Sequence, residues 1–536
     1  MDTKALRQKI LDLAIRGKLV PQDPDDEPAS VLLERIRAEK QQMVKEGKLK
    51  AKDIKNDTII YVGEDNLHYE KFQDGSVKCI EDEIPFEVPE GWCWSRLQSI
   101  TSILTDGTHK TPQYSDAGYI FLSSKNVTSG KIDWDNIMYI PETLHRELYT
   151  RLAPKAGDIL LAKNGTTGVA AIVDREEVFD IYVSLALIRI VHNIVNPLYV
   201  LRAIESSSIQ DHFNSSLKGI GVPNLHLEHI RKTLIPIPPC AEQDRIILRA
   251  DTLIPLVEQI ATDEKELQRL ISETKTKILD LAIRGKLVPQ NPDDEPASVL
   301  LERIRAEKEE LIKQGKIKRD KKESVIFKGE DNSYYEKVGG EVHCIDEEIP
   351  YDIPDTWTWM RLESCCAKEI RRGKSPKYID KSTVLVFAQK CNTKYNGIDI
   401  ELSQYLDEST LGRYPADEYM QDGDVVINST GTGTLGRVGF YRSSDNSPGL
   451  TIVPDSHVTV IRGFSCIQAF YLYAFIKAHQ GELEKKGEGS TNQKELKPLT
   501  LKEMLIAIPP SSEQERINEA INSAFKHIAV IEKSLN

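Results

Sequence analysis

Apolar side chains recur in steps of seven along residues 242–285, which predicts one long amphipathic helix that packs along its length on another helix. Two sets of apolar residues, offset by four positions, form the seam: Ile246, Leu253, Ile260, Leu267 and Leu281, with Ala250, Val257, Ile271 and Ile278. At a rise of 1.5 Å per residue, these 44 residues would span about 65 Å. Pro255 is expected to kink the helix or end its first section, and Gly285 to cap its C-terminus.

The same pattern occurs a second time, divided between the two ends of the chain. Residues 513–536 carry its first part and residues 1–17 its second, with these seam positions: Ile517, Ile521, Ala524, Ile528, Ile531, Leu535, Leu6, Ile10 and Leu13. The two segments hold 41 residues, three fewer than the uninterrupted copy. We therefore expect the termini to lie close together, as one broken helix antiparallel to residues 242–285.

The sequence around these helices is duplicated. The thirteen residues "ILDLAIRGKLVPQ" occur at 10–22 and again at 278–290, and segments 10–40 and 278–308 differ only by Asp23 against Asn291. "CIEDEIPFEVPEGWCWSRL" at 79–97 corresponds to "CIDEEIPYDIPDTWTWMRL", and "IPIPPCAEQDRI" at 235–246 corresponds to "IAIPPSSEQERI". The two copies are 268 positions apart, and a repeat period this long indicates a duplicated frame rather than a solenoid.

Between these blocks the two halves diverge. Segments 98–234 and 363–505 share only scattered glycine patterns, such as "KAGDILLAKNGTTG" against "QDGDVVINSTGTGTLG". Short apolar runs that end in polar or glycine-rich loops alternate with helical patterns, which predicts an α/β domain of roughly 155 residues for each insert. A frame copied almost exactly suggests two identical partners or an internal twofold axis, and two different inserts suggest that two different structures are recognised.

Composition and charge narrow the class of protein. The net charge is −13, but residues 86–240 and 351–510 carry only −2 and −1, so the acidic residues concentrate in the frame. The total argues weakly against nucleic-acid binding, and a near-neutral domain can still present a basic face. Eight cysteines without a CxxC pair, no signal-peptide core and no long apolar run predict a cytoplasmic protein that does not enter the membrane.

These blocks resemble the specificity subunits of type I restriction–modification systems. The resemblance rests on the "P-x-x-W-x-W" entrance to each insert, the "IP-x-PP-x-x-EQ-x-RI" exit and the helix ending "ILDLAIRGKL". It implies that each insert is a target recognition domain that reads one half of a bipartite site in double-stranded DNA. It also implies that the long antiparallel helices space these domains and hold two modification (methyltransferase) subunits, with restriction subunits joining in the full complex.

The expected fold is therefore α/β (α+β), with two recognition domains on a pseudo-twofold, circularly permuted frame. Seven segments follow from it: 1–20, the N-terminal part of the second long helix; 21–85, a short helix and β-hairpin; 86–240, target recognition domain 1; 241–288, the central long helix; 289–350, the repeated short helix and hairpin; 351–510, target recognition domain 2; and 511–536, the C-terminal part of the second long helix.

Catalytic motifs are missing from the sequence. The two Pro-Pro pairs, "IPPC" and "IPPS", lack the residues of an adenine methyltransferase loop. "RRGKS" at 371–375 has Lys368 where a phosphate-binding loop needs its first glycine, and no Cys/His spacing suits zinc. We expect a non-catalytic chain without cofactors; the resemblance places S-adenosylmethionine, ATP and magnesium in partner subunits.

DNA-contact candidates come from the polar loops of the inserts, because Arg, Lys, Asn and Gln read base edges while Ser, Thr and turn amides hold phosphates. In the first insert they are Lys110, Lys125, Asn126, Lys163, Asn164, Thr166, Lys218 and Asn224. In the second they are Arg371, Arg372, Lys374, Lys377, Gln389, Lys390, Asn392, Asn428, Ser429, Thr430, Lys486, Ser490, Asn492 and Gln493. Each fits an exposed loop residue equally well, whereas the four tryptophans at the domain entrances fit core anchors better than stacking platforms.

An alternative function remains at this point. The near-neutral inserts also suit an orphan or degenerate scaffold that binds partner subunits without reading DNA. Selection of one asymmetric, gapped DNA sequence would favour the first hypothesis, and salt-sensitive binding without sequence preference the second.

Overall fold

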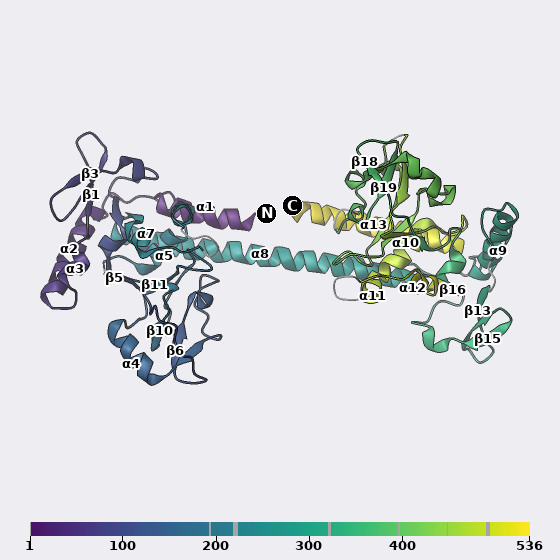
Figure 1. Cartoon of the computed structure of the whole chain (residues 1–536), viewed down its shortest axis with the longest axis horizontal. Coiled ribbons are helices and arrows are strands. Elements are labelled where there is room, and N and C mark those ends of the chain that lie inside the picture. The colour runs from purple at the N-terminus through teal and green to yellow at the C-terminus, as the bar shows by residue number, and fades with distance from the viewer. Residues whose placement is uncertain are drawn as a thin grey trace. The chain divides into compact units, whose positions relative to one another are not determined.

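The computed structural model describes residues 2–191, 194–217, 223–319, 323–394, 397–447, 449–488 and 494–535. The chain forms two compact units, Met1–Glu264 and Lys265–Asn536 (Figure 1). Each unit contains one copy of the frame and one insert, and each is described by itself below.

The first unit combines helices with short strands. Its helices are α1 (Thr3–Ile15), α2 (Ala29–Lys45), α3 (Ala51–Ile54), α4 (Glu142–Arg151), α5 (Pro197–Ile204), α6 (Ser207–Ser215), α7 (Leu227–Lys232) and the first part of α8 (Cys240–Ile283). Its strands are β1 (Ile59–Val62), β2 (His68–Lys71), β3 (Val77–Cys79), β4 (Cys93–Arg96), β5 (Thr101–Asp106), β6 (Tyr119–Leu122), β7 (Met138–Ile140), β8 (Ile159–Ala162), β9 (Ala170–Ile172), β10 (Phe179–Ile181), β11 (Leu185–Ile190) and β12 (Leu234–Ile237).

The second unit repeats this order. Besides the rest of α8, its helices are α9 (Ala297–Lys313), α10 (Ala469–Ala478), α11 (Gln480–Lys485), α12 (Pro498–Lys502) and α13 (Ser511–Leu535). Its strands are β13 (Ser324–Lys328), β14 (Tyr334–Val338), β15 (Glu341–Cys344), β16 (Thr358–Arg361), β17 (Arg371–Arg372), β18 (Tyr378–Ile379), β19 (Val384–Phe387), β20 (Gln404–Leu406), β21 (Val425–Asn428), β22 (Val438–Phe440), β23 (Thr451–Pro454), β24 (Val458–Ile461) and β25 (Leu505–Ile508).

The predicted long helix forms as α8, a single element of 44 residues that starts two residues earlier than predicted. Pro255 lies inside it and does not end it. In the first unit Ile10 and Leu11 of α1 pack on Ala250, Ile254 and Val257, while Gln22 reaches back to Glu242, so α1 runs antiparallel to α8.

Helix α13 has the corresponding contacts in the second unit. Lys275 on α8 pairs with Glu532 at 2.7 Å, and Gln290 contacts Glu513, so α13 is also antiparallel to α8. The seam is not buried throughout, because Ile260, which lies in sequence between the stretches that α1 and α13 contact, is 40% exposed. That the two chain ends meet as one broken helix stays a prediction.

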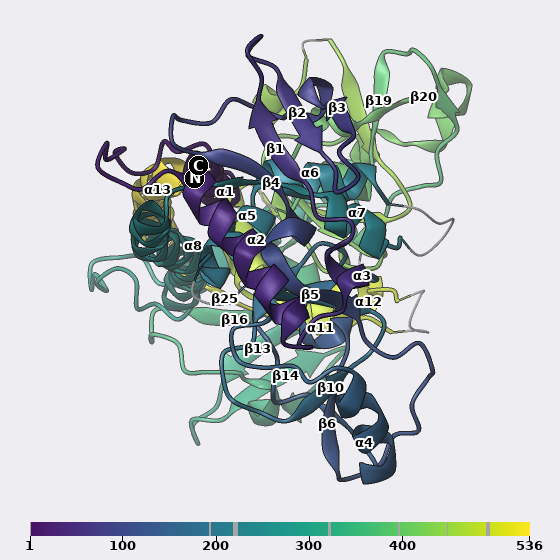
Figure 2. The same cartoon turned by 90° about the vertical axis from the view of Figure 1, so that its left-hand side faces the viewer.

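Each frame copy carries the predicted hairpin as a three-stranded sheet, β1-β2-β3 and β13-β14-β15. The "GEDN" turn ends at Asn66 and Asn332, which adopt positive φ values of 64° and 66°. Asparagine tolerates this left-handed conformation better than most residues do, so the same turn forms twice. In the first unit this sheet lies at the end opposite α4, β6 and β10 (Figures 1 and 2).

The inserts contain the sheets that position the candidate site. In the first unit the antiparallel sheet β5-β11-β8-β9 lies beside the mixed sheet β10-β6-β7, and in the second β17-β24-β21-β22 lies beside β18-β20-β19-β23. Strands β8 and β21 are buried along their whole length, which fits the apolar runs "ILLA" and "VVI"; the last residue of β21 is the buried polar Asn428. A short pair, β12-β4 or β25-β16, joins the entrance of each insert to its exit.

Candidate nucleic-acid interface

The strand registers align the two recognition domains residue by residue. Asp106 on β5 pairs with Ala186 on β11, as Arg372 on β17 pairs with Thr459 on β24. Across the next strand Leu185 pairs with Ala162, as Val458 pairs with Asn428. These registers define which side chains occupy equivalent places, although the two inserts share little sequence.

One end of each domain keeps the same contacts. Trp92 donates its indole N–H to Glu242, and Trp357 donates to Glu513, both at 2.9 Å. Burial raises the pKa of both glutamates above the usual value. All four entrance tryptophans are at most 6% exposed, which confirms that they anchor the core.

Two further contacts are retained inside the inserts. The guanidinium of Arg189 binds Asp158 at 2.6–2.7 Å, and Arg462 binds Asp424 at 2.7 Å, each carboxylate being at most 2% exposed. Burial raises the pKa of the Asp424 carboxyl despite its arginine partner. Carboxylates this deeply buried need such partners, so these pairs belong to the framework of the domain.

The opposite end of the central strand carries different side chains in the two domains. In domain 1 the ammonium of Lys163, just after β8, binds Asp106 at 2.5 Å, and both side chains are at most 10% exposed. They line a cavity of about 620 Å³ together with Asn164, Asn224 and His226. The backbone fixes this arrangement, because Leu225 donates its N–H to the Lys163 carbonyl at 2.9 Å.

Domain 2 builds the same place from other residues. Leu496 donates its N–H to the Ser429 carbonyl at 2.8 Å, so Ser429 corresponds to Lys163 and Glu495 to Asn224. Arg372, the counterpart of Asp106, forms an ion pair with Glu495. Thr430, which corresponds to Asn164, forms a hydrogen bond with the ring of His457 at 2.7 Å.

A glycine follows the first strand of each sheet and fixes the loop that begins there. A Cβ on Gly107 would lie 1.9 Å from the carbonyl oxygen of Ile181, and one on Gly373 would lie 2.2 Å from that of Pro454. Both distances are far below van der Waals contact, so any side chain would push the two segments apart. The backbone is thus held alike in both domains at the place where the side chains differ.

The predicted contact residues of domain 1 fall into three groups. Lys110, Lys125 and Thr166 are exposed, and Asn164 and Asn224 are half-buried. Lys163 is buried in its ion pair, and Asn126, which is 4% exposed, donates to the carbonyls of Asp133 and Asn136. We therefore reassign Asn126 to shaping its loop, and Lys218 lies outside the described residues.

Those of domain 2 divide in a similar way. Lys390 and Lys486 are exposed, and Lys374, Gln389 and Thr430 are half-buried. Three further residues are at most 1% exposed and bonded within the fold, so we reassign them to loop positioning: Asn392, Asn428 and Ser429. Ser490, Asn492 and Gln493 lie outside the described residues.

Besides Lys163 and Arg372, ion pairs engage two more of the predicted cations. Arg371 binds Glu418 at 2.8 Å and Asp417 at 3.1 Å, and Lys377 binds Asp407 at 2.7 Å, which lowers the pKa of that carboxyl to about 2. Both cations stay candidates for phosphate contacts, because Arg371 is 37% and Lys377 69% exposed in the side chain.

Sequence reasoning missed three residues at this end of the domains: Asp106, His226 and Glu495. Asp106 and Glu495 have pairing partners distant in the chain, such as Lys163, 57 positions after Asp106. The available signal was local: Asp106 and Arg372 each directly precede a glycine at the end of a predicted strand.

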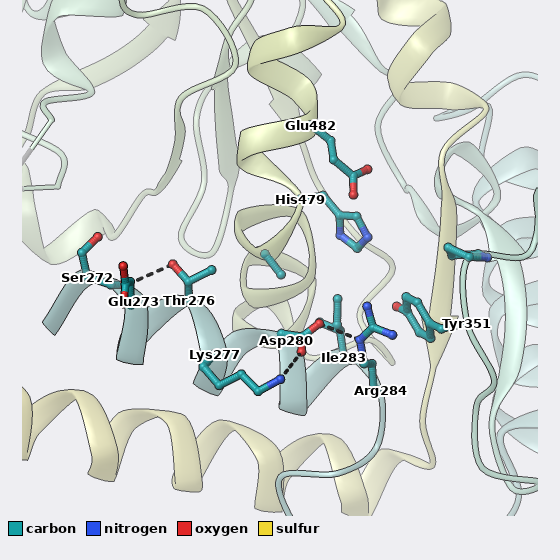
Figure 3. Close-up of a pocket in the computed structure, with 12 residues that line it drawn as sticks. Ser272, Glu273, Thr276, Lys277, Asp280, Ile283, Arg284, Tyr351, His479 and Glu482 are labelled. Atoms are coloured by element: carbon teal, nitrogen blue, oxygen red, sulfur yellow. Dashed lines mark hydrogen bonds and ion pairs between the residues drawn. The ribbon is translucent and has the colours of Figure 1, made fainter. Parts of the chain in front are cut away.

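A second cleft, of about 520 Å³, lies in the second unit beside α8 (Figure 3). Asp280 there binds Arg284 at 2.6 Å and Lys277 at 3.0 Å, and the Arg284 guanidinium lies 4.4 Å from the ring centre of Tyr351. The charges of Asp280, Lys277 and Arg284 are thus paired with one another, whereas the Tyr351 hydroxyl, which also lines the cleft, is buried and has no hydrogen-bond partner among the described residues.

At the equivalent place in the first unit, the start of helix α6 is capped by a residue of α1. Asp12, the counterpart of Asp280 in the repeat, accepts hydrogen bonds from the N–H and hydroxyl of Ser207 at the start of α6. Counted from the equivalent tyrosines Tyr199 and Tyr471, the residue at the position of Ser207 is His479. The cleft therefore results from divergence of the insert.

Two classes of site were searched over the described part of the chain. No group of three or more His, Cys, Asp or Glu side chains there could hold a metal ion. Within the same residues, no helix combines the length and apolar character that crossing a membrane requires.

Comparison with known proteins identifies the family. Residues 89–270 and 354–536 match the family described as "Type I restriction modification DNA specificity domain". The EcoAI specificity subunit of Escherichia coli is 33% identical over 412 residues, which cover 67% of this chain and 62% of that protein. The EcoEI specificity subunit of Escherichia coli is 28% identical over 588 residues, covering 98% of this chain and 89% of its own.

A solved structure supports the fold. It is described as the structural basis of complex assembly and conformational transition of the type I R-M system, and it aligns with a TM-score of 0.53 at 18% identity. The alignment covers 84% of this chain and 94% of that one, which shows a shared fold. With two matched segments at corresponding places in the duplicated frame, the chain belongs to the family of type I restriction–modification DNA specificity proteins.

Proposed function

We propose that the chain reads DNA as the specificity subunit of a type I complex, each recognition domain selecting one half of a bipartite site. The observation that carries this is the contrast within equivalent positions. Two domains with one strand register keep the buried pairs Asp158–Arg189 and Asp424–Arg462 but differ where Lys163 faces Asp106 and Arg372 faces Glu495. Stability alone would not require the two domains to carry different charged residues at the same end of the sheet.

The duplicated frame would hold two copies of one partner, the modification subunit. Helices α2 and α9 are identical over residues 29–40 and 297–308, including the exposed Glu34/Glu302 and Arg35/Arg303 pairs. At the next two positions α2 has Gln41 and Gln42 where α9 has Glu309 and Glu310, although both helices continue past this point. Identity at exposed positions exceeds what the helix fold requires, so it supports a shared binding surface.

Selection from a randomised duplex library, with the modification subunit present, tests the reading of DNA. One asymmetric, gapped consensus is expected, and replacing 98–234 by a related insert should change one half of it. Salt-sensitive binding without a consensus would instead support the scaffold hypothesis, which the net charge of −13 favours.

Native mass spectrometry tests the docking surface. The double variant Glu34→Lys/Arg35→Glu should reduce the complex from two partner copies to one, and adding Glu302→Lys/Arg303→Glu should abolish it. The matched control, Gln41→Glu/Gln42→Glu, introduces the residues of the second copy and should bind two. An unchanged stoichiometry in the quadruple variant would contradict docking on these helices.

The proposal assigns no catalysis to this chain. The purified chain alone is expected to neither methylate nor cleave DNA, and the cofactors of those reactions would bind partner subunits. Methylation of DNA by the isolated chain with S-adenosylmethionine would overturn this part.

A further inference from the structure

We propose that three equivalent positions determine which base pairs each domain selects: 106, 163 and 224 in domain 1, and 372, 429 and 495 in domain 2. We call these residues the variable cluster. Ser429 is fully buried and positions its loop, so position 429 acts only by replacing the cation of domain 1 and not by touching a base. This inference rests on the proposed reading of half-sites and assigns it to particular side chains.

The backbone places the three positions alike in both domains. Asp106 and Arg372 end the first strand of the sheet and pair with β11 and β24 in the same register. Positions 163 and 429 accept the same hydrogen bond, from Leu225 at 2.9 Å and from Leu496 at 2.8 Å. One location in the fold therefore carries two sets of side chains.

The chemistry of the cluster is inverted between the domains. In domain 1 the first strand carries the acid, Asp106, and the cation is Lys163. In domain 2 the first strand carries the cation, Arg372, and the acid is Glu495. Base pairs differ in their pattern of hydrogen-bond donors and acceptors in the major groove, so an exchange of donor for acceptor selects a different pair.

The two clusters differ in how far a ligand can reach them. Asp106 and Lys163 line the cavity of about 620 Å³ although both side chains are at most 10% exposed, whereas Glu495 is 48% exposed in its side chain. The amide oxygens of Asn164 and Asn224 are buried, and no donor among the described residues reaches them. Buried polar atoms of this kind call for a partner from water or from a bound molecule.

The fold itself does not require these particular pairs. The buried pairs Asp158–Arg189 and Asp424–Arg462 occupy equivalent places in the two domains. Where the fold needs a buried ion pair, both domains therefore keep the same residues. At the variable cluster the same backbone is stable with either arrangement. Recognition of different sequences accounts for a change confined to side chains on a retained backbone.

Domain 2 allows a commitment to one base pair. Glu495 binds one terminal nitrogen of the Arg372 guanidinium, Nη2, and both Nη2 and Nε are buried. The other terminal nitrogen, Nη1, is therefore the donor left for a base, and guanine presents two acceptors side by side, O6 and N7, in the major groove. The half-site of domain 2 should therefore contain a G·C pair that depends on Arg372.

A reciprocal transplant in the full chain, with the modification subunit bound, tests the cluster. The triple variant Asp106→Arg/Lys163→Ser/Asn224→Glu gives domain 1 the residues of domain 2. Selection from a randomised library should then return a changed first half-site, an unchanged second half-site and the same spacing. The same consensus as wild type from a folded triple variant would overturn the proposal, as would a change in both halves.

The single variant Arg372→Lys keeps the test decisive if the triple variant fails to fold, because a lysine can still pair with Glu495. It should relax one G·C position of the second half-site by about 5- to 10-fold, the low end of the range for a lost base contact, because the lysine ammonium no longer places a donor where Nη1 lies. Its salt dependence should stay unchanged, since the charge is kept. Uniformly weaker binding to all sequences would mean that Arg372 holds phosphate, and would contradict the assignment.

The wild-type chain separates the two levels of inference. If it selects no consensus, the proposed reading of DNA fails and the cluster fails with it. If it selects a bipartite consensus that neither the triple variant nor Arg372→Lys alters, the cluster alone is refuted.

Discussion

The two recognition domains differ most at one end of an otherwise shared sheet. Their central strands β8 and β21 are buried alike, and Arg189 and Arg462 hold equivalent aspartates. Past the ends of these strands, Lys163 in one domain corresponds to Ser429 in the other. Both of these side chains are buried, Lys163 against Asp106 and Ser429 against Thr459. The comparison teaches that burial fixes the need for a polar partner, while the identity of the pair can change when both partners change together.

The entrance tryptophans should give the largest effect, and the same effect in both units. Trp92→Ala or Trp357→Ala removes a large buried side chain and leaves Glu242 or Glu513 without its indole donor. Each should cost about 3–5 kcal/mol of unfolding free energy in its own unit. Peptide-resolved hydrogen exchange in urea measures this, and clearly unequal losses would mean that the frame copies are not energetically equivalent.

The next largest difference is expected between substitutions at the retained ion pair and at the variable cluster, measured as loss of unfolding free energy. Arg462→Ala leaves the Asp424 carboxylate buried without its partner, at an expected cost of about 3–5 kcal/mol. Arg372→Ala removes a cation whose partner Glu495 is half exposed, so its cost should stay below about 1 kcal/mol. Urea unfolding of the second unit compares them, and equal losses would remove the distinction between the two ends.

A pH effect is expected in domain 2. Desolvation lowers the pKa of Lys477 to about 8, and the equivalent position in domain 1 is Glu205. Because the folded pKa lies below the unfolded value of 10.5, the unfolded chain binds more protons between these values, and stability rises with pH from about 8 to 10.5. The gain should approach about 3 kcal/mol.

The variant Lys477→Met isolates this contribution from other groups that titrate in the same range. The stability of the second unit, measured by urea unfolding at several pH values, should rise less in the variant than in wild type. Parallel pH profiles for the two proteins would show that Lys477 is not desolvated.

The smallest expected difference concerns Asp12 and Asp280, identical residues with different partners. Asp12→Asn weakens the cap on α6 and should cost about 1 kcal/mol in the first unit. Asp280→Asn disturbs only pairs on the partly exposed surface of α8 and should be close to neutral. Hydrogen exchange of α6 after Asp12→Asn, against α11 after Asp280→Asn, measures the difference.

Periodicity and repetition determined much of this protein from the sequence by itself. The seven-residue pattern located α8 to within two residues at each end, and Gly285, expected to cap its C-terminus, has a positive φ of 65°. The tryptophan entrances were assigned to the core, and the duplicated frame was visible without coordinates. These features depend on local spacing or on direct comparison of two segments, so the sequence contains them completely.

Tertiary structure alone decided which polar residues are available at the candidate interface. Asparagine is a residue type that commonly contacts base edges, yet Asn126 and Asn428 are both buried and hydrogen-bonded within the fold. Asp106 belongs to the candidate interface because it pairs with Lys163, and Arg372 because it pairs with Glu495. Both partners are distant in the sequence. The free energy of a polar side chain depends on whether water or another polar group surrounds it, and that environment exists only once the strands have paired.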